Sequence, residues 1–210
     1  MSLFFDILII IFLFVLFAVP HSLLAAFGAK SKIAEEIGSK IAFYRLFYNV
    51  ISILTFIAIY YLSPKPKITL YDLDFPFDIL IFAIQLLGII GLFWSASYLD
   101  IQEFIGLSQI KRYFEGTYKI DSIDENQKLI VKGPFKYSRH PIYFFSIIVL
   151  GFRATMDIFS FIFLLCALAY FYIGSIFEEK NLTKRYGRDY SNYKKRVPRL
   201  IPNPFLFIKF

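Results

Sequence analysis

The chain has 210 residues, of which 58% are hydrophobic and 20% are aromatic, and its formal net charge is +7. The apolar share exceeds the roughly 45–50% of soluble domains, so the composition indicates an integral membrane protein and excludes an ordinary soluble domain. Nucleic-acid binding is disfavoured, because no basic region is free of apolar spans, and the excess of Lys and Arg instead fits loops that face anionic lipid. The single cysteine, Cys166, excludes an intrachain disulfide.

Apolar runs predict an all-α integral membrane protein with about five transmembrane helices. The first helix covers Leu3 to Val19 and continues past Pro20 toward Ala26. We expect it to be retained, because a cleavable signal peptide would begin with basic residues. The second and third helices run from about Phe43 to Leu62 and from about Phe77 to Leu99.

The second half of the chain predicts a helical hairpin and a tail. A hydrophilic segment from Asp100 to His140 precedes a short apolar helix, Pro141 to about Arg153, and a full span, Asp157 to about Phe177. The tight turn between the last two joins them as a hairpin. Beyond Glu178, side chains spaced four, four and three residues apart share one helical face, which predicts an amphipathic tail helix lying on the membrane or over a pocket. These side chains are Leu182, Tyr186, Tyr190 and Tyr193.

The basic residues also predict an orientation. They concentrate in residues 30–40, in residues 100–140 and in the tail, whereas the connector between the second and third spans is acidic. With five crossings the basic segments share one side, so we expect a cytoplasmic C-terminus and an external N-terminus in a prokaryotic cytoplasmic membrane. A single domain over residues 1–210 would then combine three spans in 1–99 with the loop, hairpin and tail in 100–210.

The most specific string is Gly133 to Tyr143, where a basic loop becomes an apolar helix. Gly133 lets a ligand approach the backbone closely, and Pro141 suits the first turn of a helix. The free N–H groups of that helix start suit a carboxylate or ribose oxygens, while Arg139 and His140 add donors. Flat rings could stack on Phe135, Tyr137 and Tyr143. The alternative is an interfacial helix start with a snorkelling arginine and an aromatic belt.

Glu178 and Glu179 follow the last span, where a carboxylate is costly unless it is solvated or paired. We expect a ligand role for Glu178 and a solvated helix end for Glu179, with compensation from Arg139 or a cationic ligand. His21 is either a packed histidine or a base on the substrate side. Asp100 and Glu103 line a cavity mouth or face water. The two histidines are far apart, so no metal site is predicted.

Together these motifs resemble the membrane methyltransferase superfamily that includes isoprenylcysteine carboxyl methyltransferases and phospholipid methyltransferases. The resemblance rests on Gly133-Pro134-Phe135, Arg139-His140-Pro141-Ile142-Tyr143, Glu178-Glu179-x-x-Leu182, Tyr186-Gly187-x-x-Tyr190-x-x-Tyr193 and Arg196-Val197-Pro198. It implies S-adenosylmethionine binding at the cytoplasmic face. The residues implied to hold the cofactor are Gln127, Lys128, Leu129, Ile130, Phe135, His140, Pro141, Ile142, Tyr143 and Glu178.

The N-terminal half is similar to the methanethiol S-methyltransferase branch, which is related to the NnrU-like membrane proteins. The similarity rests on His21-Ser22-Leu23-Leu24-Ala25, Tyr44-Arg45-Leu46-Phe47-Tyr48-Asn49 and Asp100…Glu103…Gly106-Leu107-x-Gln109. Two positions depart from the superfamily pattern: Gln127 often aligns with a histidine, and Gly174 stands where isoprenylcysteine methyltransferases have an arginine for the substrate carboxylate. The second departure argues against a prenylcysteine substrate.

The branch implies methyl transfer to a small thiol such as methanethiol, giving dimethyl sulfide. On this hypothesis His140 mainly serves the cofactor, and His21 or Glu103 serves the substrate. Two alternatives stay open: methylation of a lipidic substrate, such as a prenylcysteine or a phospholipid amine, and a non-catalytic membrane protein whose basic tail binds anionic lipid or a partner.

Overall fold

The computed structural model of the chain describes residues 2–120 and 129–203. The chain forms two compact units. One contains residues 1–11, 64–98 and 129–210, and the other contains residues 12–63 and 99–128. Helix α1 (Leu3–Ala25), with Pro20 inside it, contributes its first residues to the first unit and the rest to the second. We expected one domain that combines three spans in 1–99 with the loop, hairpin and tail in 100–210. Each compact unit contains residues from both ranges, and the single domain stays a prediction.

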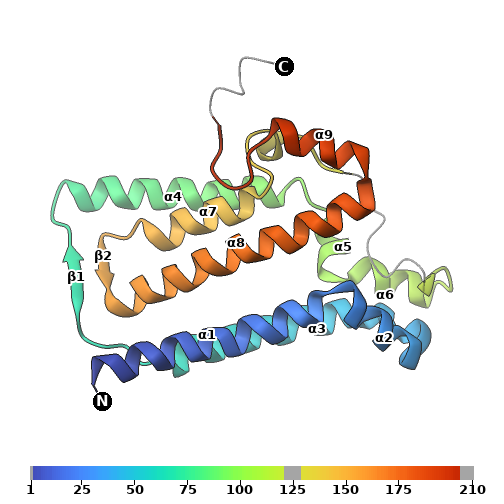
Figure 1. Cartoon of the computed structure of the whole chain (residues 1–210), viewed down its shortest axis with the longest axis horizontal. Coiled ribbons are helices and arrows are strands. Elements are labelled where there is room, and N and C mark those ends of the chain that lie inside the picture. Colours follow the sequence, from blue (N-terminus) through green and yellow to red (C-terminus); the bar gives the residue numbers. More distant parts are fainter. Residues whose placement is uncertain (1, 121–128, 204–210) are drawn as a thin grey trace. The chain divides into compact units, whose positions relative to one another are not determined.

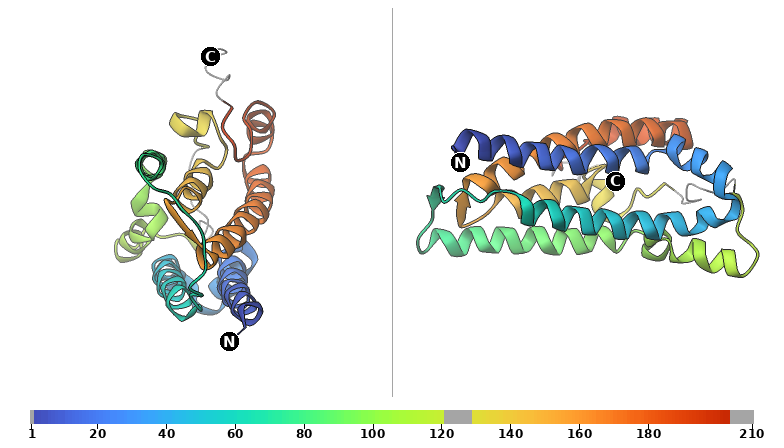
Figure 2. Two further views of the ribbon diagram at one scale, coloured as in Figure 1. Left: turned by 90° about the vertical axis from the view of Figure 1, so that its left-hand side faces the viewer. Right: turned by 90° about the horizontal axis from the view of Figure 1, so that it is seen from below.

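Three helices lie side by side in the first unit, with α7 in contact with both of the others (Figure 1 and Figure 2). They are α4 (Phe77–Ala96), α7 (Pro141–Gly151) and α8 (Ile158–Tyr186). A Cβ atom added at Gly91 would overlap the ring of Phe145, and one added at Gly88 would lie 2.8 Å from Cγ2 of Ile148. The glycines therefore allow α4 and α7 to approach closely, as small residues do between membrane helices.

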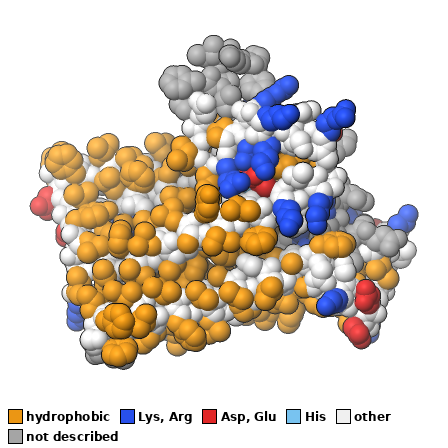
Figure 3. All heavy atoms as spheres, in the orientation of Figure 1, with side chains coloured by type: hydrophobic (Ala, Val, Ile, Leu, Met, Phe, Trp, Pro, Cys, Tyr) orange, Lys and Arg blue, Asp and Glu red, His pale blue; other side chains and the backbone are white. Residues whose placement is uncertain are grey.

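Helix α8 is longer than a bilayer core is thick. It has 29 residues, and its N-cap is Asp157, whose carboxylate accepts a hydrogen bond of 2.7 Å from the Ser160 N–H. At 1.5 Å per residue the first 20 residues cover about 30 Å, the thickness of the hydrocarbon core. Glu178 and Glu179 therefore follow the last residue needed for a crossing, and Figure 3 shows Lys and Arg side chains gathered around this end of α8 and α9.

A two-stranded ribbon joins the connector before α4 to the turn before α8. Strand β1 (Thr69–Asp72) pairs antiparallel with β2 (Thr155–Asp157), with a register irregularity between Thr69 and Tyr71. The all-α expectation omitted this ribbon. Both strands are very short, and their pairing across more than 80 residues leaves no local signal in the sequence.

The second unit packs the remainder of α1 against α3 (Tyr44–Leu62). The rings of Phe17 and Phe56 meet edge to face at 5.4 Å, and the Tyr44 hydroxyl donates to the Leu24 carbonyl. The other elements of this unit are α2 (Phe27–Ile37), the 3₁₀ helix η1 (Gly38–Phe43), α5 (Ile101–Ile105) and α6 (Leu107–Phe114).

Among the described residues, four helical stretches are long and apolar enough to cross a membrane: Leu3–Ala25, Phe27–Leu62, Phe77–Ala96 and Ile158–Tyr186. They confirm an integral membrane protein with mostly helical structure. Helix α7 has 11 residues and rises about 16 Å, which is too short to cross alone. The count of five crossings therefore stays a prediction.

The tail differs from the single helix predicted from its tyrosines. Gly187 adopts φ 56° and ends α8, and α9 (Arg188–Arg196) follows. A glycine in this conformation is a common helix stop, because other residues rarely adopt positive φ. The apolar face survives the break: Tyr190, Tyr193 and Val197 form a buried cluster against which Leu182 and Tyr186 pack.

Candidate functional site

The site lies in the first unit, on the segment that leads from the 3₁₀ helix η3 (Gly133–Lys136) into α7. Gly133 adopts φ 57°, and a Cβ atom there would overlap the ring of Tyr98, so only glycine fits this turn. Pro141 occupies the first turn of α7, as predicted, with His140 as the N-cap residue. Residues 137–140 form a short non-helical loop between η3 and α7.

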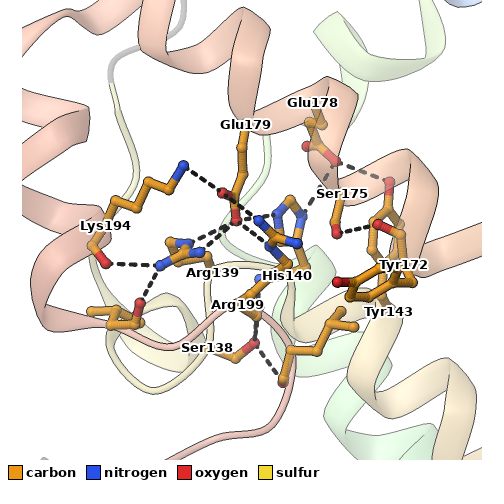
Figure 4. A network of polar contacts seen from close by, with 12 residues as sticks. Ser138, Arg139, His140, Tyr143, Tyr172, Ser175, Glu178, Glu179, Lys194 and Arg199 are labelled. Carbon is orange, nitrogen blue, oxygen red and sulfur yellow. Dashed lines mark hydrogen bonds and ion pairs between the residues drawn. The ribbon is translucent and has the colours of Figure 1, made fainter.

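The centre of the site is the carboxylate of Glu179, a side chain that is only 2% exposed (Figure 4). Its Oε1 accepts hydrogen bonds from Arg139 Nε at 2.9 Å, from Arg139 Nη2 at 2.7 Å and from Arg199 Nε at 3.1 Å. Lys194 Nζ lies 3.2 Å from Oε2. The expected solvated role of Glu179 is therefore wrong: α8 turns this carboxylate toward cations from three other segments, and Arg139 is the compensating partner.

Arg139 also holds the end of α9. Its Nη1 donates to the carbonyl oxygens of Lys194 at 2.9 Å and Val197 at 2.6 Å. These carbonyls are at the helix C-terminus and have no intrahelical donors, so a guanidinium satisfies them well. One side chain thus ties the loop before α7 to both α8 and α9.

A second layer of the site is a stack of three aromatic rings. The rings of His140 and Tyr143 lie 5.2 Å apart at an interplanar angle of 4°, and those of Tyr143 and Phe171 lie 4.8 Å apart at 14°. The Tyr143 hydroxyl donates to Glu178 Oε2 at 2.9 Å. Glu178 is 46% exposed along its side chain, so its carboxylate borders both the stack and the outside of the unit.

His140 lies between the two carboxylates and is 5% exposed. Its Nδ1 is 3.3 Å from Glu178 Oε2, and its Nε2 is 3.4 Å from Glu179 Oε1. The second approach is close enough for an ion pair, yet it lacks hydrogen-bond geometry, and Nε2 makes no hydrogen bond within the described chain. A buried ring nitrogen in this state is available to a further polar group.

The backbone at the start of α7 is less open than expected. The N–H of His140 donates to the Arg199 carbonyl at 3.1 Å, so it is not free for a ligand. Pro141 has no N–H, and the Phe144 N–H donates to the His140 carbonyl at 3.1 Å. The N–H group of Ile142 remains as a candidate donor, since first-turn N–H groups have no intrahelical acceptor.

Helix α9 covers the segment before η3. The Tyr193 hydroxyl donates to the Phe135 carbonyl at 2.6 Å, and Leu129 packs against the tyrosine cluster. Burial raises the pKa of Tyr190 and of Tyr193, so both keep their hydroxyl protons at neutral pH. A cavity of about 340 Å³ lies here, lined by Leu129, Val131, Lys136, Asp189, Asn192, Tyr193, Arg196 and Val197.

The expected cofactor residues are thus partly brought together. The residues at or next to the ring stack are His140, Pro141, Ile142, Tyr143 and Glu178. Phe135 lies in η3, where its carbonyl accepts from Tyr193, and Gly133 is in the turn at the start of η3. Leu129 lines the cavity beneath α9, and Ile130 follows it as a half-buried residue. Gln127 and Lys128 lie outside the described residues.

His21 belongs to the second unit and is packed among partners. Its ring stacks between those of Phe17 at 5.0 Å and Tyr48 at 5.1 Å. Its Nδ1 is 2.9 Å from the Ser52 hydroxyl, and its Nε2 is 2.9 Å from the Tyr48 hydroxyl. The ring also borders an apolar cavity of about 470 Å³ that Asn49 helps to line. Packing and a substrate-side role are therefore compatible here.

Glu103 in the same unit is engaged in a partly buried ion pair. Arg112 binds both of its oxygens, with Nη1 2.9 Å from Oε2 and Nη2 2.7 Å from Oε1. Gln109 Nε2 also donates to Glu103 Oε1, at 3.3 Å. The hydrogen bonds between Arg112 and Glu103 raise the pKa of Arg112. Asp100, expected to line a cavity mouth or face water, is exposed, and it also caps α5 by accepting the Glu103 N–H at 3.0 Å. These contacts favour a structural role for Glu103.

Four further residues of the site escaped the sequence reasoning as partners: Ser138, Glu179, Lys194 and Arg199. A signal was present in the two charged strings that flank prolines, Arg139-His140-Pro141 and Pro198-Arg199. Nothing local indicates that both arginines meet the same carboxylate, because Glu179 is 40 residues from one and 20 from the other.

The long apolar helices indicate an integral membrane protein, and a buried polar cluster lies near the C-terminal end of α8. The phospholipid methyltransferase family model matches residues 81–189, which is more than half of the chain. The protein therefore belongs to the phospholipid methyltransferase family, which supports a methyltransferase activity.

Curated relatives carry a more specific name. Methanethiol S-methyltransferase 1 of Bradyrhizobium diazoefficiens is 26% identical over 198 residues, covering 93% of this chain and 67% of the relative. Methanethiol S-methyltransferase of Crocosphaera subtropica is 27% identical over 190 residues, covering 89% of this chain and 71% of the relative. No solved structure gives a significant match.

Proposed function

We propose that this protein transfers a methyl group from S-adenosylmethionine to a small thiol such as methanethiol, giving dimethyl sulfide. Family membership and the names of the relatives support methyl transfer. The observation that carries the proposal is the stack of His140, Tyr143 and Phe171, beside which lies the half-exposed carboxylate of Glu178. A flat ring or a cation can lie against such rings, and a carboxylate can bind hydroxyl or ammonium groups.

The residues present fit this cofactor. S-adenosylmethionine combines a flat adenine, ribose hydroxyls, a carboxylate, an ammonium group and a positively charged sulfur. Glu178 offers an acceptor, the N–H group of Ile142 suits a carboxylate, and His140 Nε2 is buried without a hydrogen bond. When bound, the cofactor supplies a methyl group on a sulfonium centre.

The protein has to align an acceptor sulfur opposite the leaving sulfur and exclude water. Bound S-adenosylmethionine would supply its methyl group to the acceptor sulfur and leave as S-adenosylhomocysteine, and the thiol proton would pass to a base of the protein. A thiol is mostly protonated at neutral pH, since even a cysteine side chain has a pKa of about 8.5, so a base has to take up this proton. In this scheme His140 helps to hold the cofactor.

We assign the role of base on the substrate side to His21 rather than to Glu103. Glu103 would have to leave its bidentate pair with Arg112 to accept a proton, whereas His21 borders an apolar cavity of about 470 Å³. A small apolar thiol suits a cavity of this size and character. We further propose that the site and C-terminus face the cytoplasm and the N-terminus lies outside, in keeping with the basic segments.

A second candidate is methylation of a lipidic substrate, which the match to the phospholipid methyltransferase model supports. Gly174 bears on the choice among such substrates. A Cβ atom at this position would meet no heavy atom within 4 Å, so the place held by an arginine in isoprenylcysteine methyltransferases is open here. A prenylcysteine carboxylate would find no cation at residue 174.

The test is a transfer assay with methyl-labelled S-adenosylmethionine and the full-length protein in nanodiscs. Methanethiol, a prenylcysteine and phosphatidylethanolamine are offered as acceptors. We expect label in dimethyl sulfide, a loss of turnover in His21→Ala and normal turnover in Glu36→Gln, whose side chain is exposed on α2. Label in a lipid product would support the second candidate. Full turnover in His21→Ala would remove that residue from the mechanism.

A further inference from the structure

The last described segment, Val197–Asn203, lies along the loop that carries His140. The Arg139 N–H donates to the Pro198 carbonyl at 2.9 Å, and the His140 N–H donates to the Arg199 carbonyl at 3.1 Å. We call Val197–Asn203 the C-terminal strap. Its main chain supplies acceptors to two successive residues of the site.

Ser138 reinforces this arrangement. Its side chain is fully buried, and its hydroxyl lies 2.8 Å from the Leu200 carbonyl and 3.1 Å from the Arg199 carbonyl. The same hydroxyl accepts the His140 N–H at 3.2 Å. At the far end of the strap, the Asn203 N–H donates to the Tyr137 carbonyl at 3.3 Å.

The strap also contributes one charged side chain. Arg199 Nε and Nη2 lie 3.1 and 3.4 Å from the two oxygens of Glu179, and its guanidinium lies 5.7 Å from the ring centre of Tyr172. Arg199 therefore shares the buried carboxylate with Arg139. Because Glu179 Oε1 is also 3.4 Å from His140 Nε2, moving this carboxylate would change the surroundings of the histidine ring.

Residues 137–140 belong to neither η3 nor α7. Pro134 of η3 accepts the N–H groups of Tyr137 and Ser138, but neither helix supplies an acceptor for the N–H groups of Arg139 and His140. Buried backbone groups without partners are costly, and the strap supplies the acceptors instead. The conformation of this loop therefore depends on residues some 60 positions later in the chain.

We propose that the C-terminal strap, and Arg199 in particular, is a positioning element that holds Arg139 and His140 in the geometry needed for cofactor binding. Arg199 acts through Glu179 and through its own carbonyl. The part of this proposal that concerns binding rests on the proposed function, whereas the part that concerns loop geometry does not.

Two pairs of variants test the strap in nanodiscs. Arg199→Gln removes the guanidinium and keeps the backbone, and Arg188→Gln is its control, because Arg188 is exposed at the start of α9. A chain that ends at Val197 keeps the buried valine but loses the carbonyls of Pro198, Arg199 and Leu200. A chain that ends at Asn203 retains every strap contact described above.

The first readout is hydrogen exchange at the amides of Arg139 and His140, without any cofactor. We expect these amides to exchange at least about tenfold faster in the chain ending at Val197 and in Arg199→Gln than in their controls. Unchanged exchange in both would overturn the proposal, even if the truncated chain proves hard to fold, because Arg199→Gln keeps the whole backbone.

The second readout separates positioning from general weakening of the fold. At a temperature well below unfolding, Arg199→Gln should raise the KM for S-adenosylmethionine about tenfold, with kcat changed by less than about twofold. Arg199→Lys, which keeps a donor and a charge, should restore most of the KM. Equal losses in both variants, or a fall in kcat alone, would contradict a positioning role. If the unaltered protein shows no turnover, the proposed function fails, while the exchange experiment still decides the fate of the strap.

Discussion

Replacing Glu179 by glutamine should destabilise the protein more than any other single change to the site. The substitution keeps the size of the side chain and removes the negative charge that Arg139, Arg199 and Lys194 share. Arg139 is the critical partner, because its side chain is 7% exposed and cannot turn to water without unfolding the loop.

The magnitude follows from the burial of each partner. Removing one member of a buried ion pair costs about 3–5 kcal/mol, since it leaves a buried charge without compensation. Arg199 and Lys194 are 28% and 46% exposed, and water would partly compensate them, so we expect the lower end, about 3 kcal/mol. For a chain of this length each kcal/mol corresponds to about 2–4 °C, giving a fall in melting temperature of about 6–12 °C.

The chain has a built-in reporter for the assay. Cys166 is its single cysteine and lies half-buried in α8, so a thiol-reactive dye can report unfolding without an engineered cysteine. Glu178→Gln is the matched control, because it makes the same chemical change at the neighbouring, half-exposed residue. We expect that control to melt within about 3 °C of the unaltered protein. Equal melting temperatures for the two variants would refute the reasoning that Glu179 is a buried ionic hub.

Two further predictions concern the turns and the second unit. Gly133→Ala should cost about 1–3 kcal/mol more than Gly187→Ala in thermal unfolding, because both glycines have positive φ but only the first would push a Cβ into Tyr98; equal costs would contradict that contact. Glu103→Gln and Arg112→Gln should each lower the melting temperature, and the double variant should fall well short of the sum, since both remove the same pair. A Glu103→Gln protein that melts normally but loses turnover would instead support proton acceptance by Glu103.

The membrane helices could be predicted from the sequence because their signal is local. The predicted starts at Leu3, Phe77 and Asp157 lie within a residue or two of the first residues of α1, α4 and α8. Pro141 was correctly placed in the first turn of α7 for the same reason. Gly187 was a missed local signal: it stops the helix at a position where the tyrosine spacing alone suggested continuation.

The site was predictable only in part, because its polar contacts join distant segments. The aromatic and proline string predicted the neighbourhood of His140 and Tyr143. The sequence could not decide which of the adjacent residues Glu178 and Glu179 is buried, since a rotation of 100° along α8 separates their side chains. Which of the two is buried depends on where Arg139 lies in the folded chain. In the same way, the pairing of Glu103 with Arg112 depends on the fold and not on a local sequence pattern.

The central claim is that the stack and Glu178 form a cofactor site, and calorimetric titration with S-adenosylhomocysteine, the demethylated product, tests it most directly. We predict saturable binding with one site per chain, about tenfold weaker in Glu178→Gln and unchanged in the exposed control Glu36→Gln. Absence of binding to the unaltered protein would contradict the claim and favour a non-catalytic membrane protein whose basic tail binds anionic lipid or a partner. Equal affinity in all three proteins would remove Glu178 from the site.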